Sequence, residues 1–257
     1  MKAPTLATLQ RLVAGRSASR SPISRHWHAV ALALLFVVSL PAATTRIYAS
    51  DEIQYFAFLR SLWFDHDLSF DNEYRYFYDH GIARAYGFHE THLERTTGTG
   101  HRLNFGTVGC ALLWAPFYLA ADLGVRAAHA AGASVHPDGL SRPYIAAVCY
   151  ASAVYGLMAL LVSALAAGRL LEAIAPGRDH RAAVTASALV VWAGTPLAFY
   201  TYLAPASAHA CSAFVVAVFL LAWLCVRRQW TARGLIVLGA LAALMAMVRE
   251  QDIFFVV

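Results

Sequence analysis

Two adjacent acidic residues, Asp51 and Glu52, follow the first apolar run of the chain. Ser50 is a typical helix N-cap, and apolar residues recur after it at helical spacing. The dipole and N–H groups at the start of a helix favour an ionised carboxylate, which can act as a general base. Such a base at the lipid boundary would take a proton from an acceptor. The alternative is that both acids only cap the helix.

His209 and Arg249 lie at the ends of later apolar runs. The planar guanidinium of arginine binds oxyanions through two parallel hydrogen bonds, so Arg249 suits a lipid phosphate. The alternatives are a flanking arginine that snorkels to the membrane surface and a histidine that marks a helix boundary. A further polar segment, Asn104-Phe105-Gly106-Thr107-Val108-Gly109, lacks the Gly-Lys-Ser/Thr of a phosphate-binding loop.

The triplet Asp65-His66-Asp67 has the Asp-x-Asp spacing that can bind a divalent cation. A divalent cation is therefore a candidate cofactor, although short Asp-rich turns are common without one. The cysteines, Cys110, Cys149, Cys211 and Cys225, lie in apolar stretches and form no Cys-x-x-Cys pair. They indicate small buried hydrophobic residues rather than a disulfide framework or a zinc site.

The composition of the chain indicates the environment in which these residues lie. The chain has 257 residues, of which 59% are hydrophobic and 14% are charged, with a mean hydropathy of +0.53. A soluble domain has about 25% charged residues, so a polytopic membrane protein is favoured over a cytosolic or disordered one. The net charge of +5 comes from separate basic clusters, which argues against nucleic acid as a partner.

Apolar runs of spanning length predict an all-α fold, a bundle of transmembrane helices. The five predicted spans are residues 29–49, 144–167, 182–203, 209–226 and 234–248. A sixth apolar stretch, residues 107–131, contains Pro116, Asp122, Arg126 and His129. Because charges deep in a bilayer cost about 2.5–3.5 kcal/mol each, we expect this stretch to lie flat or to re-enter.

The basic residues predict the orientation, since cytoplasmic loops carry an excess of Lys and Arg. The basic segment 1–28 then lies in the cytoplasm, and residues 29–257 form the membrane module with a long external loop, 50–143, that carries juxtamembrane helices. This topology puts Asp51, Glu52, His209 and Arg249 on one side of the membrane at similar depth, as a lipid-phosphate site requires. The chain stops within an apolar run at Val257, so we expect a C-terminally truncated protein.

The order of these features resembles the GT-C superfamily of membrane glycosyltransferases, in particular the protein-mannosyltransferase and aminoarabinose-transferase type. The resembling pieces follow a basic first span; they are Asp51-Glu52, Phe64-Asp65-His66-Asp67-Leu68, Asn72-Glu73-Tyr74, Asn104-Phe105, the stretch 109–118, Thr195-Pro196-Leu197-Ala198-Phe199-Tyr200, the stretch 209–214, and Met247-Val248-Arg249-Glu250-Gln251. They cover nearly the whole chain, which resembles only the N-terminal half of the family's members.

The resemblance implies an integral membrane enzyme of the inner or plasma membrane. It would transfer a sugar from a polyprenyl-phosphate donor to an external acceptor with inversion. By this resemblance Asp51 is the catalytic base, and Glu52, Asn104, His209 and Arg249 bind substrate; some members use a metal and others do not. Two other classes of function remain open from the residues. They are a non-catalytic membrane subunit or truncated fragment, and a transporter or flippase, which would place polar groups near the bilayer midplane.

Overall fold

The computed structural model describes residues 22–82 and 87–256, and within these ranges the chain is helical and contains no β-strand. Only a single antiparallel bridge joins Thr96 to Arg102. The predicted all-α class is therefore confirmed for the described part of the chain. Most of the basic N-terminal segment, residues 1–21, lies outside the described residues.

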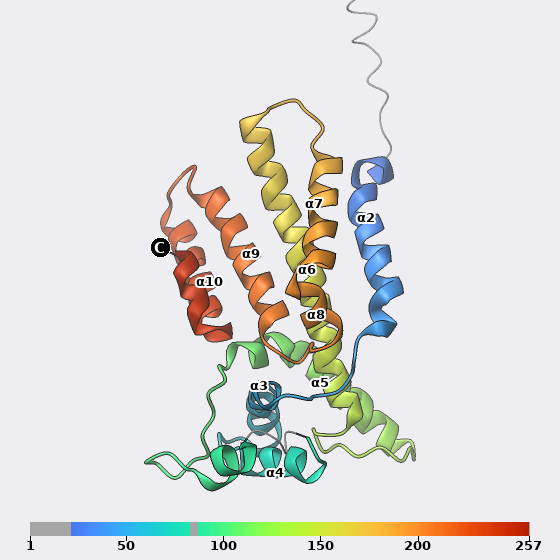
Figure 1. Ribbon diagram of the computed structural model, residues 1–257, viewed down its shortest axis with the longest axis vertical. Coiled ribbons are helices and arrows are strands. Elements are labelled where there is room, and N and C mark those ends of the chain that lie inside the picture. The colour runs from blue at the N-terminus through green and yellow to red at the C-terminus, as the bar shows by residue number, and fades with distance from the viewer. Residues whose placement is uncertain (1–21, 83–86, 257) are drawn as a thin grey trace, which may run out of the picture.

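The helices form two groups (Figure 1). The helices of the first group stand side by side: α2 (Pro22–Ser39), α6 (Arg142–Ile174), α7 (Arg181–Gly194), α9 (His209–Val226) and α10 (Ala232–Val248). The second group lies at one end of the first and comprises α3 (Ser50–Arg60), α4 (Asp71–Asp79) and α5 (Gly109–Ala130). The remaining helices are short: η1 (Leu40–Ala42), η2 (Ser61–Asp65), η3 (His89–Glu94), α8 (Pro196–Tyr202) and η4 (Glu250–Val256), which follows α10.

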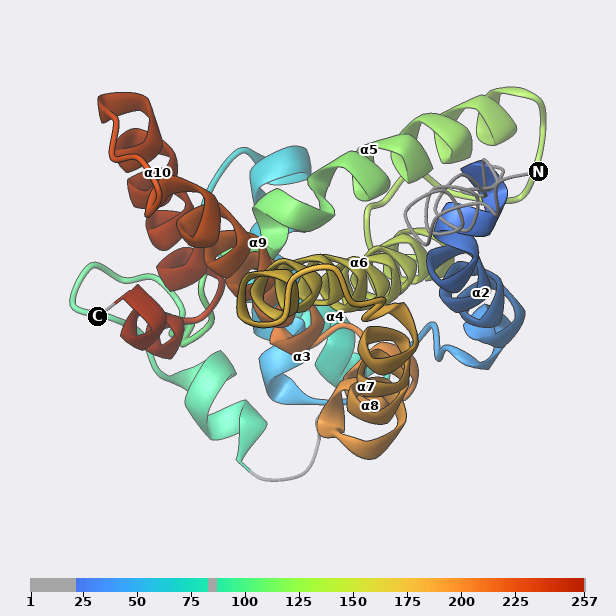
Figure 2. The same cartoon turned by 90° about the horizontal axis from the view of Figure 1, so that it is seen from above.

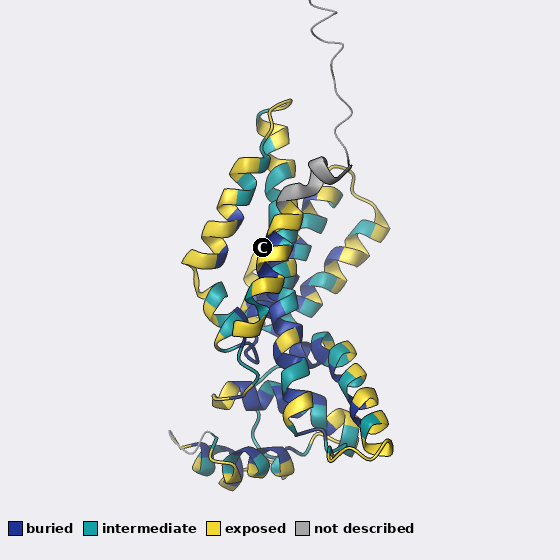
Figure 3. Ribbon diagram, turned by 90° about the vertical axis from the view of Figure 1, so that its right-hand side faces the viewer, coloured by how far each residue is buried: buried dark blue, intermediate teal, exposed yellow. Residues whose placement is uncertain are grey.

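Among the described residues, α6 and α9 are long and apolar enough to cross a membrane, and the bent pair α7–α8 is a third candidate. The upright helices turn large apolar side chains outward, among them Val38 on α2 at 77% exposure and Ile236 on α10 at 70%. Figure 3 shows these outward faces as exposed and the buried residues concentrated toward the α3–α5 end. An apolar surface of this kind suits contact with lipid.

Two predicted spans are wrong in their extent, and proline is the reason in both. The run 29–49 is helical only as far as Ala42, because Pro41 cannot continue the hydrogen-bond ladder, and the chain is not helical from Ala43 to Ala49. The run 182–203 breaks by 68° between α7 and α8. There Thr195 adopts the extended conformation favoured before Pro196 and caps α8 by accepting from the Leu197 N–H.

The other spans agree better with the sequence. Helix α9 has the predicted bounds. Helix α6 is longer than predicted, by Arg142 and Pro143 at its start and by residues 168–174 at its end. Helix α10 begins two residues early, after a Thr231 N-cap. Helix α10 and the apolar part of α2, Ala29–Ala42, are shorter than the roughly 20 residues that a spanning helix needs.

Helix α5 lies across the direction of α6 and α7, as the view from above shows (Figure 2). Its charged residue Asp122 is buried but accepts hydrogen bonds from Trp63 Nε1 at 3.1 Å, Tyr144 Oη at 2.8 Å and Arg126 Nε at 2.8 Å. Burial acts to raise the pKa of Asp122, but these three donors together hold it below its usual value. The charge of Asp122, which argued against a spanning segment, is thus stabilised by hydrogen bonds within the protein.

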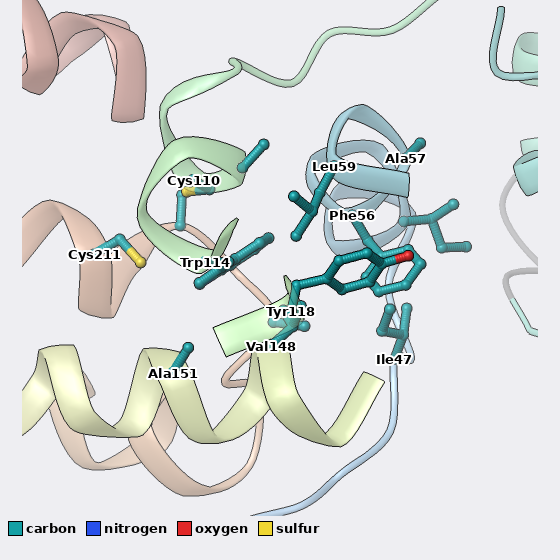
Figure 4. Close-up of a cluster of buried hydrophobic side chains, with 14 of the residues drawn as sticks. Ile47, Phe56, Ala57, Leu59, Cys110, Trp114, Tyr118, Val148, Ala151 and Cys211 are labelled. Atoms are coloured by element: carbon teal, nitrogen blue, oxygen red, sulfur yellow. The ribbon is translucent and has the colours of Figure 1, made fainter. Parts of the chain in front are cut away.

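The main core lies where α3, α4 and α5 pack against the first turns of α6, against α9 and against the second half of α10. It is rich in aromatic side chains, and Figure 4 shows Phe56, Trp114 and Tyr118 in its centre. Trp114 Nε1 donates to Ser152 Oγ at 2.7 Å, so the buried indole N–H is satisfied. This core fixes α3 beneath the ends of α9 and α10.

Candidate functional site

Helix α3 begins at the end of the upright helices and presents Asp51 in its first turn. Asp51 is exposed, whereas Glu52 is buried. Glu52 Oε2 accepts from the backbone N–H groups of Tyr48 at 2.7 Å and Ala49 at 3.1 Å, which is the reach-back half of a capping box. The two adjacent acids therefore have different surroundings.

The contacts of Glu52 are those of a helix cap. Its second oxygen, Oε1, is buried without a hydrogen-bond partner. Burial raises the pKa of Glu52, although the N–H groups of Tyr48 and Ala49 act to lower it. Glu52 thus lies where the alternative of a helix cap places it. Its role in substrate binding stays a prediction.

His209 and Arg249 meet directly. Nη1 of Arg249 lies 3.2 Å from Nδ1 of His209. Because a guanidinium has no acceptor, this contact requires Nδ1 to accept and leaves the ring proton on Nε2. Tyr200 of α8 stacks on the imidazole at 3.6 Å with an interplanar angle of 21°. The histidine is held by α8 and by the end of α10, and both His209 and Arg249 are partly exposed.

Asp51 completes this cluster. Its carboxylate interacts electrostatically with His209 and with Tyr55, which lies one turn further along α3. Tyr55 in turn interacts with Arg249 and Glu250. Burial raises the pKa of Tyr55 to about 12, with smaller contributions from Cys110 and Asp51, whereas Arg249 acts to lower it. The phenol is therefore a protonated donor at neutral pH.

The position of Arg249 is set by close packing of α5 against the end of α10. Thr107 Oγ1 donates to the carbonyl oxygen of Val248 at 2.7 Å. A Cβ atom on Gly109 would lie 2.4 Å from the Val248 nitrogen and from the Met247 carbonyl carbon, so only glycine permits this approach. Arg249 follows immediately, in an extended conformation that ends α10.

Asn104 positions a loop rather than touching the cluster directly. Its Nδ2 donates to the carbonyl oxygen of Gln54 at 3.1 Å, and its Oδ1 accepts from the Gly106 N–H at 2.8 Å. The side chain of Gln54 accepts from the Phe105 N–H at 2.6 Å. These bonds hold the loop against α3 beside Tyr55. The predicted contact of Asn104 with substrate stays a prediction.

The Asp-x-Asp pair is engaged by protein donors. Asp65 pairs with Arg60 and accepts from Asn72 Nδ2 at 2.6 Å. Asp67 accepts from Ser61 Oγ at 2.8 Å and from the Ser69 N–H at 3.0 Å. Across residues 22–82 and 87–256, no three metal-ligating side chains converge. A divalent cation at this pair would have to displace these donors.

Sequence reasoning missed Tyr55, Tyr200 and Glu250 as members of the cluster. Tyr55 carries a signal, because residues four apart share a helix face and Tyr55 follows Asp51 by four. Glu250 also carries one, since it directly follows Arg249. Tyr200 has no such signal, since only the folding of α8 against α9 brings it in. The cluster therefore joins α3, α8, α9 and the α10–η4 junction.

Comparison with family models, with curated proteins and with solved structures finds no match to this chain. The cluster of Asp51, His209 and Arg249 is therefore the feature of this chain that bears most directly on its function. These three residues supply a carboxylate, an imidazole N–H donor and a guanidinium at the end of apolar helices.

Proposed function

We propose that this protein is an integral membrane glycosyltransferase that uses a polyprenyl-phosphate sugar as donor. The observation that carries the proposal is the 3.2 Å contact between His209 and Arg249 beside the carboxylate of Asp51. An arginine held by a second side chain is well placed to bind a phosphate, and an exposed carboxylate is accessible to an acceptor hydroxyl. The ordered resemblance to GT-C enzymes supports the same reading.

In the proposed reaction the acceptor oxygen forms a bond to C1 of the sugar, with inversion, while the bond from C1 to the phosphate oxygen breaks. The acceptor proton passes to Asp51. The electron pair of the broken bond stays on polyprenyl phosphate, and Arg249 stabilises its charge. The Nε2–H of His209 and the phenol of Tyr55 are further donors available in the cluster.

The proposed topology has five spans, a cytoplasmic N-terminus and an external loop of residues 50–143, in an inner or plasma membrane. It is supported by where the arginines lie. Arg178 and Arg181, and Arg227 and Arg228, flank the ends of α6 and α9 that are opposite to α3. Basic loops at one end and the cluster at the other fit the positive-inside rule. The short helices α2 and α10 would require local thinning of the bilayer.

In the test, membranes that contain the chain are incubated with polyprenyl-phosphate hexoses and pentoses. Mass spectrometry then measures how much of each donor has lost its sugar. We expect Asp51→Asn to lower conversion by about 10²–10⁴-fold while membrane insertion is unchanged. Glu90→Gln removes another exposed carboxylate of the proposed external loop and should have no effect.

Equal conversion by the Asp51→Asn variant and the parent chain would remove Asp51 as the base. No conversion by the parent chain, together with binding of a partner membrane protein, would favour the non-catalytic subunit. Uptake of solute into proteoliposomes would favour the transporter.

A further inference from the structure

The end of the bundle opposite to Asp51 contains two adjoining cavities. One, of about 720 Å³, lies between the C-terminal ends of α6 and α9 and is lined by Arg169, Arg227 and Arg228. The other, of about 620 Å³, lies between the end of α6 and the start of α7 and is lined by Arg178 and Arg181. Arg169 lines both cavities, so the two form one arginine-lined region, here called the arginine pocket.

The acids of this region are occupied by local contacts. Glu172 Oε1 accepts from the Gly177 N–H at 3.1 Å, and Asp179 lies 3.8 Å from Arg181. Arg169 Nη1 lies 2.6 Å from the Cys225 sulfur. Two carboxylates, Glu172 and Asp179, line the cavities, against the five arginines Arg169, Arg178, Arg181, Arg227 and Arg228. The arginines therefore outnumber the acids, and the pocket has a net positive charge.

The pocket also has an apolar side. Leu170, Ala173 and Leu224 contribute to its wall. Beside it, Ile174 is 79% exposed and Trp230 is 56% exposed. A binding region that combines guanidinium groups with an exposed apolar surface matches an amphipathic anion better than a fully soluble one.

We propose that the arginine pocket binds the phosphate headgroup of an anionic phospholipid, with its acyl chains along the outer faces of α6 and α9. The pocket lies at the ends of the two helices that are long enough to span a membrane, where headgroups are found. Arg227 lines the pocket, and its guanidinium lies 4.8 Å from the centroid of the Trp223 ring, one turn earlier on α9. This site shares no residue with the Asp51 cluster and does not depend on the proposed reaction.

The test is native mass spectrometry of the full chain in neutral detergent, titrated with phosphatidylglycerol, with phosphatidylcholine of the same chains, or with inorganic phosphate. We expect phosphatidylglycerol to bind at least tenfold more tightly than phosphatidylcholine. The variants Arg169→Gln and Arg227→Gln/Arg228→Gln should remove this preference. Arg233→Gln is the matched control, because Arg233 is exposed near the same end but lines neither cavity; it should retain the preference.

Three outcomes would overturn the proposal. Equal binding of the two phospholipids would show that the headgroup charge is not recognised. An equal loss in the Arg233→Gln variant would show that net charge, and not the pocket, is responsible. Inorganic phosphate that competes at the same concentration as phosphatidylglycerol would assign the pocket to a free anion.

Discussion

Nη1 of Arg249 lies 3.2 Å from Nδ1 of His209, although 40 positions separate the two residues in the chain. The contact joins the end of α10 to the beginning of α9 and gives the arginine a fixed direction. An arginine that only snorkelled to the membrane surface would need no such partner. The pair is therefore the structural centre of the proposed phosphate site.

If His209 acts by positioning Arg249, replacing both residues should cost no more than replacing Arg249 alone. We expect His209→Ala to weaken binding of polyprenyl phosphate several-fold in the parent chain and to have little effect in an Arg249→Gln background, since contacting residues couple by about 0.5–3 kcal/mol. The measurement is a double-mutant cycle of dissociation constants. Additive losses would show that the two side chains act separately.

Gly109 is predicted to be irreplaceable because the backbone of α10 occupies the space of its missing side chain. Gly109→Ala should push the end of α10 away and lower the stability by about 1–3 kcal/mol, with a loss of polyprenyl-phosphate binding. Gly124→Ala in the same helix is the control, since nothing lies within 4 Å of the added Cβ atom. Thermal unfolding in detergent measures the stability of both variants. Equal unfolding temperatures would contradict the close packing of α5 against the end of α10.

The raised pKa of Glu73 predicts that the stability of the fold depends on pH. Burial raises the pKa of Glu73 from its ordinary 4.5 to about 7, although Arg60 at 2.9 Å opposes the shift. Between these two pH values the folded state holds more protons than the unfolded state, so stability falls as pH rises from 4.5 to about 7. At about 1.4 kcal/mol per pKa unit the loss amounts to a few kcal/mol.

The check is the unfolding temperature of the parent chain and the Glu73→Gln variant between pH 4.5 and 7. The variant should show a much weaker slope. A small slope should remain, because burial also raises the pKa of Glu52. An unchanged slope in the variant would assign the pH dependence to another group.

Asp122 should be essential to the seating of α5. Asp122→Ala removes the acceptor of the buried Tyr144 hydroxyl, and a buried donor left without a partner costs about 1–3 kcal/mol. We expect a marked fall in the unfolding temperature, compared with no change for Glu90→Ala at an exposed position. Similar unfolding temperatures for the two variants would show that α5 does not depend on this carboxylate.

The sequence was sufficient for some elements and insufficient for others. The bounds of α9 follow from an uninterrupted apolar run between His209 and Arg227, because local hydropathy determines them. The breaks at Pro41 and Pro196 carried a local signal that apolar content outweighed in the prediction. The inward turn of Glu52 had no such signal, since Asp51 and Glu52 have the same chemistry and only the packing of α3 distinguishes them.

The candidate site, too, could be predicted from the sequence only in part. The prediction that Asp51, His209 and Arg249 lie at one end of the apolar helices required only charge and hydropathy along the chain. The contact of His209 with Arg249 depends on how the end of α10 packs beside the start of α9, and the stacking of Tyr200 on His209 depends on the bend before Pro196. Tertiary packing of this kind is not encoded in any one stretch of residues.

The central claim is that Arg249 binds the phosphate of a polyprenyl lipid. Its most direct test is titration of the purified chain with polyprenyl phosphate, measured by native mass spectrometry, for the parent, Arg249→Gln and the exposed control Arg95→Gln. The account predicts at least a tenfold weaker affinity for Arg249→Gln and an unchanged affinity for Arg95→Gln. Equal affinities of all three proteins would contradict it.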